Sequence, residues 1–203
     1  MDTTSVDFWF DPSCPYTWVT SRWIEEVRAV RPVEVRWHVL SLAVLNEGRE
    51  DDPEGDPEGW LWQPVRVCAA VRQRYGSDGL GRFYAAYGIR AHDRDEEVDF
   101  AAALADAGLD AGLADTASST DHDEAVRASH AEGIGQVGGD VGTPVLAAEQ
   151  PDGTRVAFFG PVLSRVPRGD AAGRLWDGTL LVAGTPAFHE LKGRPTAKPT
   201  ATD

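Results

Sequence analysis

The chain has 203 residues, of which 42% are apolar and 26% are charged, and its formal net charge is −14 at pH 7. This length suffices for one large domain or for one domain that carries an insertion, and the seven Trp and seven Phe residues can supply its core. The negative charge repels phosphate backbones and anionic membrane surfaces, so it argues against nucleic-acid and membrane partners.

The N-terminus lacks the features of a secretory signal. Met-Asp-Thr-Thr leads directly into an apolar run at residues 6–10, without a basic region or a cleavage site. No apolar stretch approaches the roughly 18 residues of a membrane-spanning helix. We therefore expect a cytoplasmic protein. Because the cytosol keeps thiols reduced, a structural disulfide between Cys14 and Cys68 is not expected.

The first 40 residues predict a strand, a helix and a second strand. Residues 5–10 form an apolar run that the turn Asp-Pro-Ser ends. The next apolar residues recur at spacings of four, four and three, as on one helical face: Val19, Trp23, Val27 and Val30. Pro32 ends this helix, and residues 33–40 then alternate as a strand does. This order suggests a right-handed βαβ unit.

The middle of the chain predicts helices. Residues 47–59 hold seven acids and one arginine, broken by Pro and Gly, and are typical of a solvated loop. Residues 60–135 are rich in Ala and suggest successive helices that end near four glycines: Gly76, Gly88, Gly108 and Gly133. We place an inserted helical domain at 46–137, between two parts of the core domain at 1–45 and 138–192.

The C-terminal part predicts a hairpin and a last helix. Residues 143–148 and 155–159 have strand character and are joined by a turn. A final helix is expected from Pro167 to Gly178. The tail, residues 193–203, has no apolar face to bury, and we expect it to be disordered.

Cys14 and Pro15 stand where the first turn leads into the first helix. Unpaired N–H groups and the positive end of the helix dipole favour a thiolate there, and such sites typically lower a cysteine pKa to roughly 3.5 to 7.5. Pro15 suits the first helical turn, where its missing N–H costs nothing. We therefore expect a lowered pKa for Cys14. A buried, inert cysteine at a helix start is the alternative.

A second feature is Thr143-Pro144, directly before a predicted strand. A proline at the start of a strand is common and by itself carries little information. Combined with a βαβ unit led by a Cys-Pro helix and followed by a hairpin and a helix, it matches the order of the thioredoxin fold. In that fold the proline before the third strand is cis and lies against the active cysteine. We therefore predict a cis Thr143–Pro144 bond.

Several blocks of sequence, in the same order, carry a resemblance to a known family. They are residues 7–15 (DFWFDPSCP), 20–23 (TSRW), 40–46 (LSLAVLN), 64–67 (PVRV), 140–144 (DVGTP) and 157–164 (AFFGPVLS). The chain resembles DsbA-family, FrnE-like proteins, and most closely the actinobacterial mycothiol-dependent reductases, also called nitroreductases. The resemblance implies an α/β, thioredoxin-like fold with a large inserted all-helical domain, and the small thiol mycothiol as co-reductant.

The resemblance also implies roles for individual residues. Cys14 would be the nucleophilic cysteine, and Thr143–Pro144 the cis-proline element that presents backbone groups to a bound thiol. Pro15 and Tyr16 belong to the same thiol-binding motif, and Tyr16 stands where close relatives tend to carry Trp. Asn46 follows the second strand, where its amide could bind a ligand. A purely structural Asn in a turn is the alternative.

The sequence departs from the family pattern at Thr17, where the usual motif has a second cysteine. Thr17 cannot form the internal disulfide that releases a mixed-disulfide intermediate. Its hydroxyl can still donate a hydrogen bond to the Cys14 thiolate, which favours the charged form. We therefore expect a monothiol cycle, in which Cys14 attacks or is oxidised and mycothiol resolves it. Net disulfide donation to proteins is not expected.

The remaining candidates have structural interpretations. Cys68 lies in an apolar helical segment and is expected to be buried, with a role as a remote resolving cysteine as the alternative. The five histidines lack metal-ligand spacing, so no metal is expected. His92-Asp93 lies in a charged stretch and is interpreted as solvated. The predicted partners are a small thiol and a small electrophilic or oxidised substrate, and a homodimer is left open.

Two other functions stay open. Kappa-class thiol transferases and 2-hydroxychromene-2-carboxylate isomerases share the inserted helical domain and activate a thiol cofactor with a hydroxyl residue, so Thr17 is compatible with their chemistry. The other alternative is a non-catalytic thioredoxin-fold binding module that lost its redox function with the second cysteine.

Overall fold

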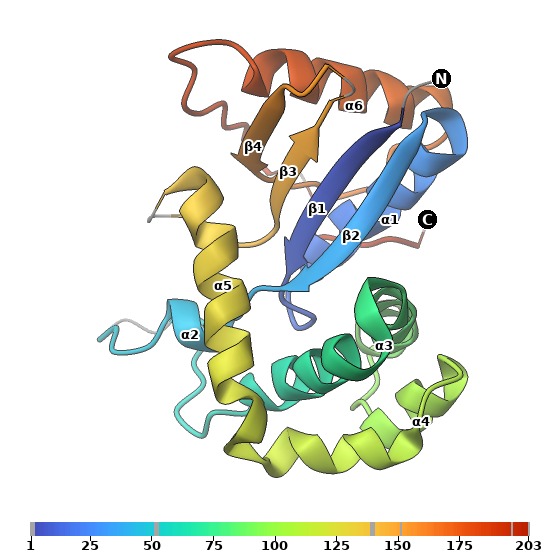
Figure 1. Ribbon diagram of the computed structural model, residues 1–203, viewed down its shortest axis with the longest axis vertical. Helices are drawn as coiled ribbons and strands as arrows, with labels where there is room; N and C mark the ends of the chain where they lie inside the picture. Colours follow the sequence, from blue (N-terminus) through green and yellow to red (C-terminus); the bar gives the residue numbers. More distant parts are fainter. Residues whose placement is uncertain (1–2, 51–52, 139–140, 151, 196, 203) are drawn as a thin grey trace.

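A four-stranded sheet with the order β2-β1-β3-β4 organises the protein (Figure 1). β1 (Thr4–Phe10) pairs in parallel with β2 (Val33–Val39). On its other side β1 pairs antiparallel with β3 (Val145–Glu149), which forms a hairpin with β4 (Arg155–Phe159). The predicted strands and hairpin are confirmed. The computed structural model describes residues 3–50, 53–138, 141–150, 152–195 and 197–202.

Two helices pack together against the sheet. α1 (Pro15–Val30) connects β1 to β2, and α6 (Asp170–Ala183) follows the hairpin. The Trp23 indole of α1 donates a hydrogen bond to a backbone carbonyl of α6 at 3.2 Å. α6 was expected to end at Gly178. It continues to Ala183, because Leu180 and Ala183 still pack against the core.

Side chains alternate between the two faces of the sheet, as strand geometry requires. Val6, Phe8 and Phe10 of β1 lie in the main core. The intervening Trp9 belongs to a second, smaller core with residues of α5 (Asp123–Val137). The sheet therefore has helices on both faces, and α5 covers the second one.

The other helices follow β2 and precede β3 in the chain, as the predicted insertion does. Of these, α3 and α4 lie at one end of the sheet (Figure 1). α3 and α5 nevertheless pack against strands of the sheet, so they share its core. Where the insertion begins and ends stays a prediction. Besides α5, the elements in this part are α2 (Leu42–Leu45), α3 (Trp62–Gly88), the π-helix η1 (Ile89–Asp93), α4 (Phe100–Asp106) and the 3-10 helices η2 (Ala111–Ser118) and η3 (Thr120–His122).

The glycines of this region have different roles. Gly76 has a positive φ of 70° and interrupts α3, and Gly88 is the last residue of α3. Gly108 follows the end of α4. The prediction that Gly133 ends a helix is wrong, because it lies inside α5. A Cβ at that position would come within 2.7 Å of the Trp9 ring, so glycine allows α5 to approach the sheet closely.

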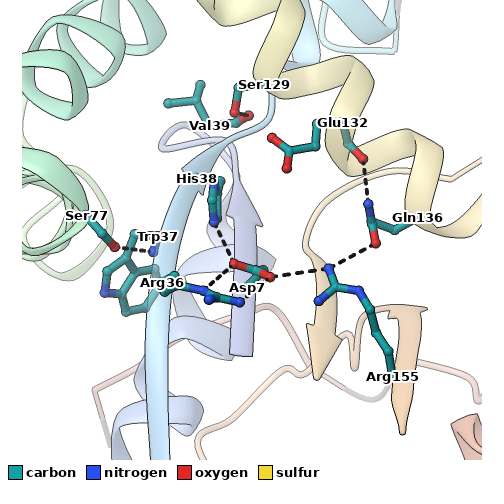
Figure 2. Close-up of polar contacts among 10 residues, drawn as sticks. All are labelled: Asp7, Arg36, Trp37, His38, Val39, Ser77, Ser129, Glu132, Gln136 and Arg155. Carbon is teal, nitrogen blue, oxygen red and sulfur yellow. Dashed lines mark hydrogen bonds and ion pairs between the residues drawn. The ribbon is translucent and has the colours of Figure 1, made fainter. Parts of the chain in front are cut away.

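A buried carboxylate, Asp7, joins three strands on the face that α5 covers. Arg36 of β2 donates two hydrogen bonds to it at 2.8 and 2.9 Å, and His38 Nε2 lies 2.8 Å from it. Arg155 of β4 reaches Asp7 at 3.3 Å and Gln136 of α5 at 3.1 Å, as Figure 2 shows. Burial opposes the charge of Asp7, but the hydrogen bonds from His38 and Arg36 outweigh it and hold its pKa well below the usual range.

The C-terminal tail was expected to be disordered, but its described residues contact the rest of the protein. Thr200 N–H donates to the Ser164 carbonyl at 3.1 Å, and Arg165 donates to the Lys198 carbonyl at 2.7 Å. Ala201 packs against the core. Hydrogen bonds to backbone groups hold this segment, and amino-acid composition does not reveal such bonds. None of the helices in the described ranges is both long and apolar enough to cross a membrane.

The Asp7 network leads to a prediction about stability and pH. Because the folded-state pKa of Asp7 lies below the unfolded value of about 3.9, its charge stabilises the fold above about pH 4, and this is lost as the pH falls toward the folded-state pKa. Asp7→Asn should therefore lower the free energy of unfolding by about 1.5–3 kcal/mol at pH 7. The deficit relative to the wild type should shrink below about pH 4.

Urea denaturation at pH 7 and at pH 3 measures both values. Asp177→Asn is the matched control, because Asp177 forms an ion pair with Arg31 at the protein surface. That exposed pair should contribute less than about 1 kcal/mol. A deficit for Asp7→Asn that is the same at both pH values would contradict the assignment of a stabilising charge to Asp7.

Candidate active site

Cys14 lies at the junction between β1 and α1. It is the N-cap residue of α1 in an extended conformation, with φ −81° and ψ 115°, and Pro15 follows at the first helical position. The Cys14 carbonyl accepts the first helical hydrogen bond, from Trp18 N–H at 3.0 Å. The side chain is half-buried. The sequence therefore places this sulfur at a helix N-terminus, as expected.

The electrostatic environment of Cys14 differs from the expectation. Burial raises the pKa of Cys14 above its ordinary value, and the negative charge of Asp11 raises it further. The Thr17 hydroxyl and the N–H groups of Thr17 and Tyr16 act in the opposite direction and lower the pKa, but they do not outweigh the burial. The prediction of a lowered pKa is therefore wrong for the resting protein, although the groups on which it was based are present.

Thr143 joins the start of α1 to the loop before β3. The Thr17 hydroxyl donates a hydrogen bond to Thr143 Oγ1 at 3.1 Å, and Asp11 N–H donates to the same oxygen at 3.2 Å. Thr17 is fully buried, and Thr143 is nearly so. The Thr143–Pro144 bond is cis, which confirms that prediction. The structure thus brings Thr143 beside Thr17, although 126 residues separate them in the sequence.

Asp11 is a site residue that the sequence analysis missed. It has no exposed surface, and its carboxylate accepts hydrogen bonds from Ser13 N–H at 2.7 Å and from Leu42 N–H at 2.6 Å. Its backbone carbonyl accepts from Cys14 N–H at 3.2 Å. Burial raises the pKa of Asp11 to about 7. The Asp-Pro-Ser motif predicts only a turn, and nothing else in the sequence indicates a buried acid at this position.

Asn46 lines a cavity of about 270 Å³ between α2 and the loop before Thr143. The residue is 8% exposed, and its Nδ2 is buried without a hydrogen-bond partner among the described residues. An unpaired buried donor is costly and calls for a partner. A ligand oxygen could supply it. The walls of the cavity include Leu42, Leu45, Asn46, Arg49, Val141 and Gly142.

Pro15 and Tyr16 are close to Cys14 because they follow it in the first turn of α1. Pro15 is exposed and Tyr16 is half-buried, so both can be reached by a ligand at Cys14. They do not line the cavity at Asn46. The predicted site residues thus form two groups. The first lies at the helix start and contains Cys14, Pro15, Tyr16 and Thr17, with Thr143 and Pro144 beside them. The second is Asn46 at the cavity, which the loop before Thr143 also lines.

The helical part of the chain also contributes to the site. His92 of η1 lies 2.8 Å from the Pro12 carbonyl, in the loop before Cys14. Asp93 accepts a hydrogen bond from the Trp18 indole at 2.8 Å. The interpretation of this pair as solvated is therefore wrong, because long-range packing brings η1 against α1. Cys68 is fully buried, as expected, and burial raises its pKa well above the ordinary value.

Two comparisons identify the sequence family. The family model described as "Mycothiol-dependent nitroreductase Rv2466c" (Rv2466c-like) matches residues 13–193. The Mycobacterium tuberculosis protein Rv2286c is 37% identical over 197 residues, which cover 93% of this chain and 81% of that protein.

The described residues contain no group of three or more His, Cys, Asp or Glu side chains placed to hold a metal ion.

Solved structures agree on the fold. The structure described as "probable DsbA oxidoreductase SCO1869" from Streptomyces coelicolor matches with a TM-score of 0.59 at 16% identity, covering 94% of this chain and all of that one. Oxidoreductase DsbA from Xylella fastidiosa matches with a TM-score of 0.52 at 15% identity, covering 89% of this chain and 86% of that one. The chain therefore has the thioredoxin-like fold of DsbA proteins, and it belongs to the Rv2466c-like family of mycothiol-dependent nitroreductases.

Proposed function

We propose that the protein is a monothiol oxidoreductase that reduces small oxidised or electrophilic substrates through Cys14, with mycothiol as co-substrate. One observation carries the proposal. The position that would hold a second cysteine holds Thr17, whose hydroxyl is hydrogen-bonded to Thr143 beside the cis-proline. Cys14 is therefore the one sulfur at this helix start, and the other cysteine, Cys68, is fully buried.

The chemistry for a mixed disulfide of mycothiol and a small thiol balances with one cysteine. Cys14, as the thiolate, attacks the mycothiol sulfur and breaks the S–S bond, and the small thiol leaves and takes up a proton. Cys14 is then held in a disulfide with mycothiol. A second mycothiol thiolate breaks this bond and releases Cys14. In total the small thiol is released in its reduced form, one free mycothiol is consumed, and the mycothiol unit of the substrate leaves as mycothiol disulfide. One S–S bond is broken and one is formed, so no further oxidant or reductant is needed.

The residues around Cys14 fit a small polar thiol. Asn46 Nδ2 can donate to an oxygen of the bound thiol, because this buried donor has no partner among the described residues. The cavity at Asn46 extends to Val141 and Gly142, directly before Thr143. We infer that Thr143 and Pro144 bind the thiol close to its sulfur, and that Pro15 and Tyr16 cover its exposed side.

The pKa of Cys14 sets a requirement for this cycle. Burial keeps the resting thiol protonated at neutral pH, so bound substrate must favour the thiolate. The N–H groups of Tyr16 and Thr17 are placed to stabilise the charge once it forms. The Thr17 hydroxyl can join them, because its hydrogen is free to turn from Thr143 toward Cys14.

We expect incubation with mycothiol disulfide to add one mycothiol to the chain, on Cys14, because no second sulfur in the site can expel it. Intact mass followed by peptide mapping measures the adduct and its position. Cys14→Ser should form none. Asn46→Ala should slow adduct formation by about tenfold, the effect of losing roughly 1.4 kcal/mol of binding. It should leave methylthiolation by methyl methanethiosulfonate unchanged, because that reagent has no polar body.

Each other outcome has a definite meaning. Tight binding of mycothiol without any adduct would contradict the oxidoreductase and favour a transferase of the kappa-class type. Neither binding nor adduct would favour a non-catalytic module. Equal slowing of both reagents by Asn46→Ala would show that Asn46 acts on Cys14 and does not bind the thiol.

Thr17→Cys should convert the site to dithiol chemistry. Two cysteines separated by two residues in a first helical turn lie within disulfide reach. The introduced sulfur should expel mycothiol from Cys14, so the adduct no longer accumulates, and insulin reduction should rise above the wild-type level. Thr17→Ser is the control, because it keeps the hydroxyl and should keep the adduct. An adduct that persists in Thr17→Cys would mean that this position does not face Cys14.

A further inference from the structure

The site contains a buried carboxylate, Asp11, that the proposed cycle does not use. It differs from Asp7, the other buried aspartate of this segment. Arg36, Arg155 and His38 surround Asp7. No arginine, lysine or histidine of the described ranges hydrogen-bonds or forms an ion pair with the Asp11 carboxylate. The carboxylate accepts from the backbone N–H groups of Ser13 and Leu42, and the neutral Ser13 hydroxyl also lowers its pKa.

Two histidines lie near the Asp11 loop, His92 at the Pro12 carbonyl and His130 at Ser41 N–H, and burial lowers the pKa of both. Asp11 itself interacts most strongly with groups that are not cationic. Its charge acts on Cys14 at the start of α1, and the charge of Glu54, in the loop after α2, acts on Asp11. None of these groups can offset a second negative charge, so ionising both Asp11 and Cys14 is costly. The groups of α3 on which the charge of Asp11 acts are Cys68, Tyr84 and Tyr87.

We propose that Asp11 and Cys14 form a coupled acid pair that shares one negative charge, with Asp11 taking up a proton when the Cys14 thiolate forms. The proton balance is simple. The Cys14 thiol loses one proton and the Asp11 carboxylate gains one, so the net charge of the pair stays at −1. No oxidant or reductant is involved. Asp11 does not touch the substrate in this account, and it acts through Cys14 as a positioning and charge-coupling residue.

The geometry explains how the pair is built. The Cys14 N–H is bonded to the Asp11 carbonyl, and the Asp11 carboxylate is bonded to Ser13 N–H, so both groups lie in one short loop. Burial raises the pKa of Asp11 to about 7, which places its charge change at neutral pH. Above that pH, the ionised Asp11 opposes the thiolate. A proton on Asp11 removes that opposition.

The importance of the pair for turnover rests on the proposed function, but its existence can be tested without mycothiol or substrate. The probe is iodoacetamide, and the readout is the alkylation rate of Cys14, followed by peptide mass between pH 5.5 and 10. In the wild type the logarithm of the rate should rise with pH up to about 7. It should then flatten over about one pH unit as Asp11 ionises, and rise again, which is the signature of a pair coupled by about one pKa unit.

Asp11→Asn keeps the shape of the side chain and removes its charge. It should abolish the flat region and make alkylation at pH 8 to 9 about tenfold faster than in the wild type. Asp7→Asn is the matched control, because Asp7 is a buried aspartate on the face of the sheet that α5 covers. It should keep the flat region, whatever its effect on stability.

A wild-type profile with a single uninterrupted rise would overturn the pair, and this result needs no variant to fold. A folded Asp11→Asn protein that keeps the wild-type profile would also overturn it. Failure of the proposed function has a different signature, because a protein that shows the flat region but never forms a mycothiol adduct keeps the pair and loses the cycle.

Discussion

The hydroxyl of Thr143 is the point on which the site depends. It accepts one hydrogen bond from Asp11 N–H and another from the Thr17 hydroxyl, at the junction of β1, α1 and the loop before β3. Through these two bonds the cis-proline loop is fixed against the residues that flank Cys14. Asp11 then extends the connection to α2 through Leu42 N–H, and Asn46 is the C-cap residue of α2. The cavity at Asn46 is lined by α2 and by the loop before Thr143, and these hydrogen bonds hold both segments in place.

The competition between burial and the helix N-terminus decides the state of Cys14. A helix dipole contributes typically 0.3–1 kcal/mol and up to about 2 kcal/mol, which corresponds to about one pKa unit or less in most cases. Burial acts in the opposite direction and can shift a pKa by up to about 3–5 units when it is complete, so even partial burial can exceed the effect of the dipole. Burial therefore prevails, and the nearby charge of Asp11 adds to it. The N–H groups at the helix start serve to hold a thiolate that the bound substrate or a proton on Asp11 makes accessible.

Local sequence patterns predicted much of the fold. Alternation marked β2, apolar spacing marked α1, and the combination of a Cys-Pro helix start with Thr143-Pro144 located two segments that lie together. The predictions that failed concern residues whose surroundings are set by segments distant in the sequence. The Asp11 turn becomes buried only when α2 and α3 pack over it, and His92 reaches Pro12 only through η1. Gly133 signalled a helix end by composition, but its role depends on Trp9, far away in sequence.

The central claim is that one sulfur carries the chemistry, and turnover of cysteine variants tests it most directly. The measurement is kcat/KM for reduction of a mixed disulfide of mycothiol and a small thiol, with mycothiol as reductant, in folded protein. Cys68→Ala should keep the wild-type value, since Cys68 is fully buried and its pKa is raised well above the ordinary value. Cys14→Ser should have no activity above background. A folded Cys68→Ala protein as inactive as Cys14→Ser would contradict the account, because it would show that Cys68 serves as a second sulfur in the cycle.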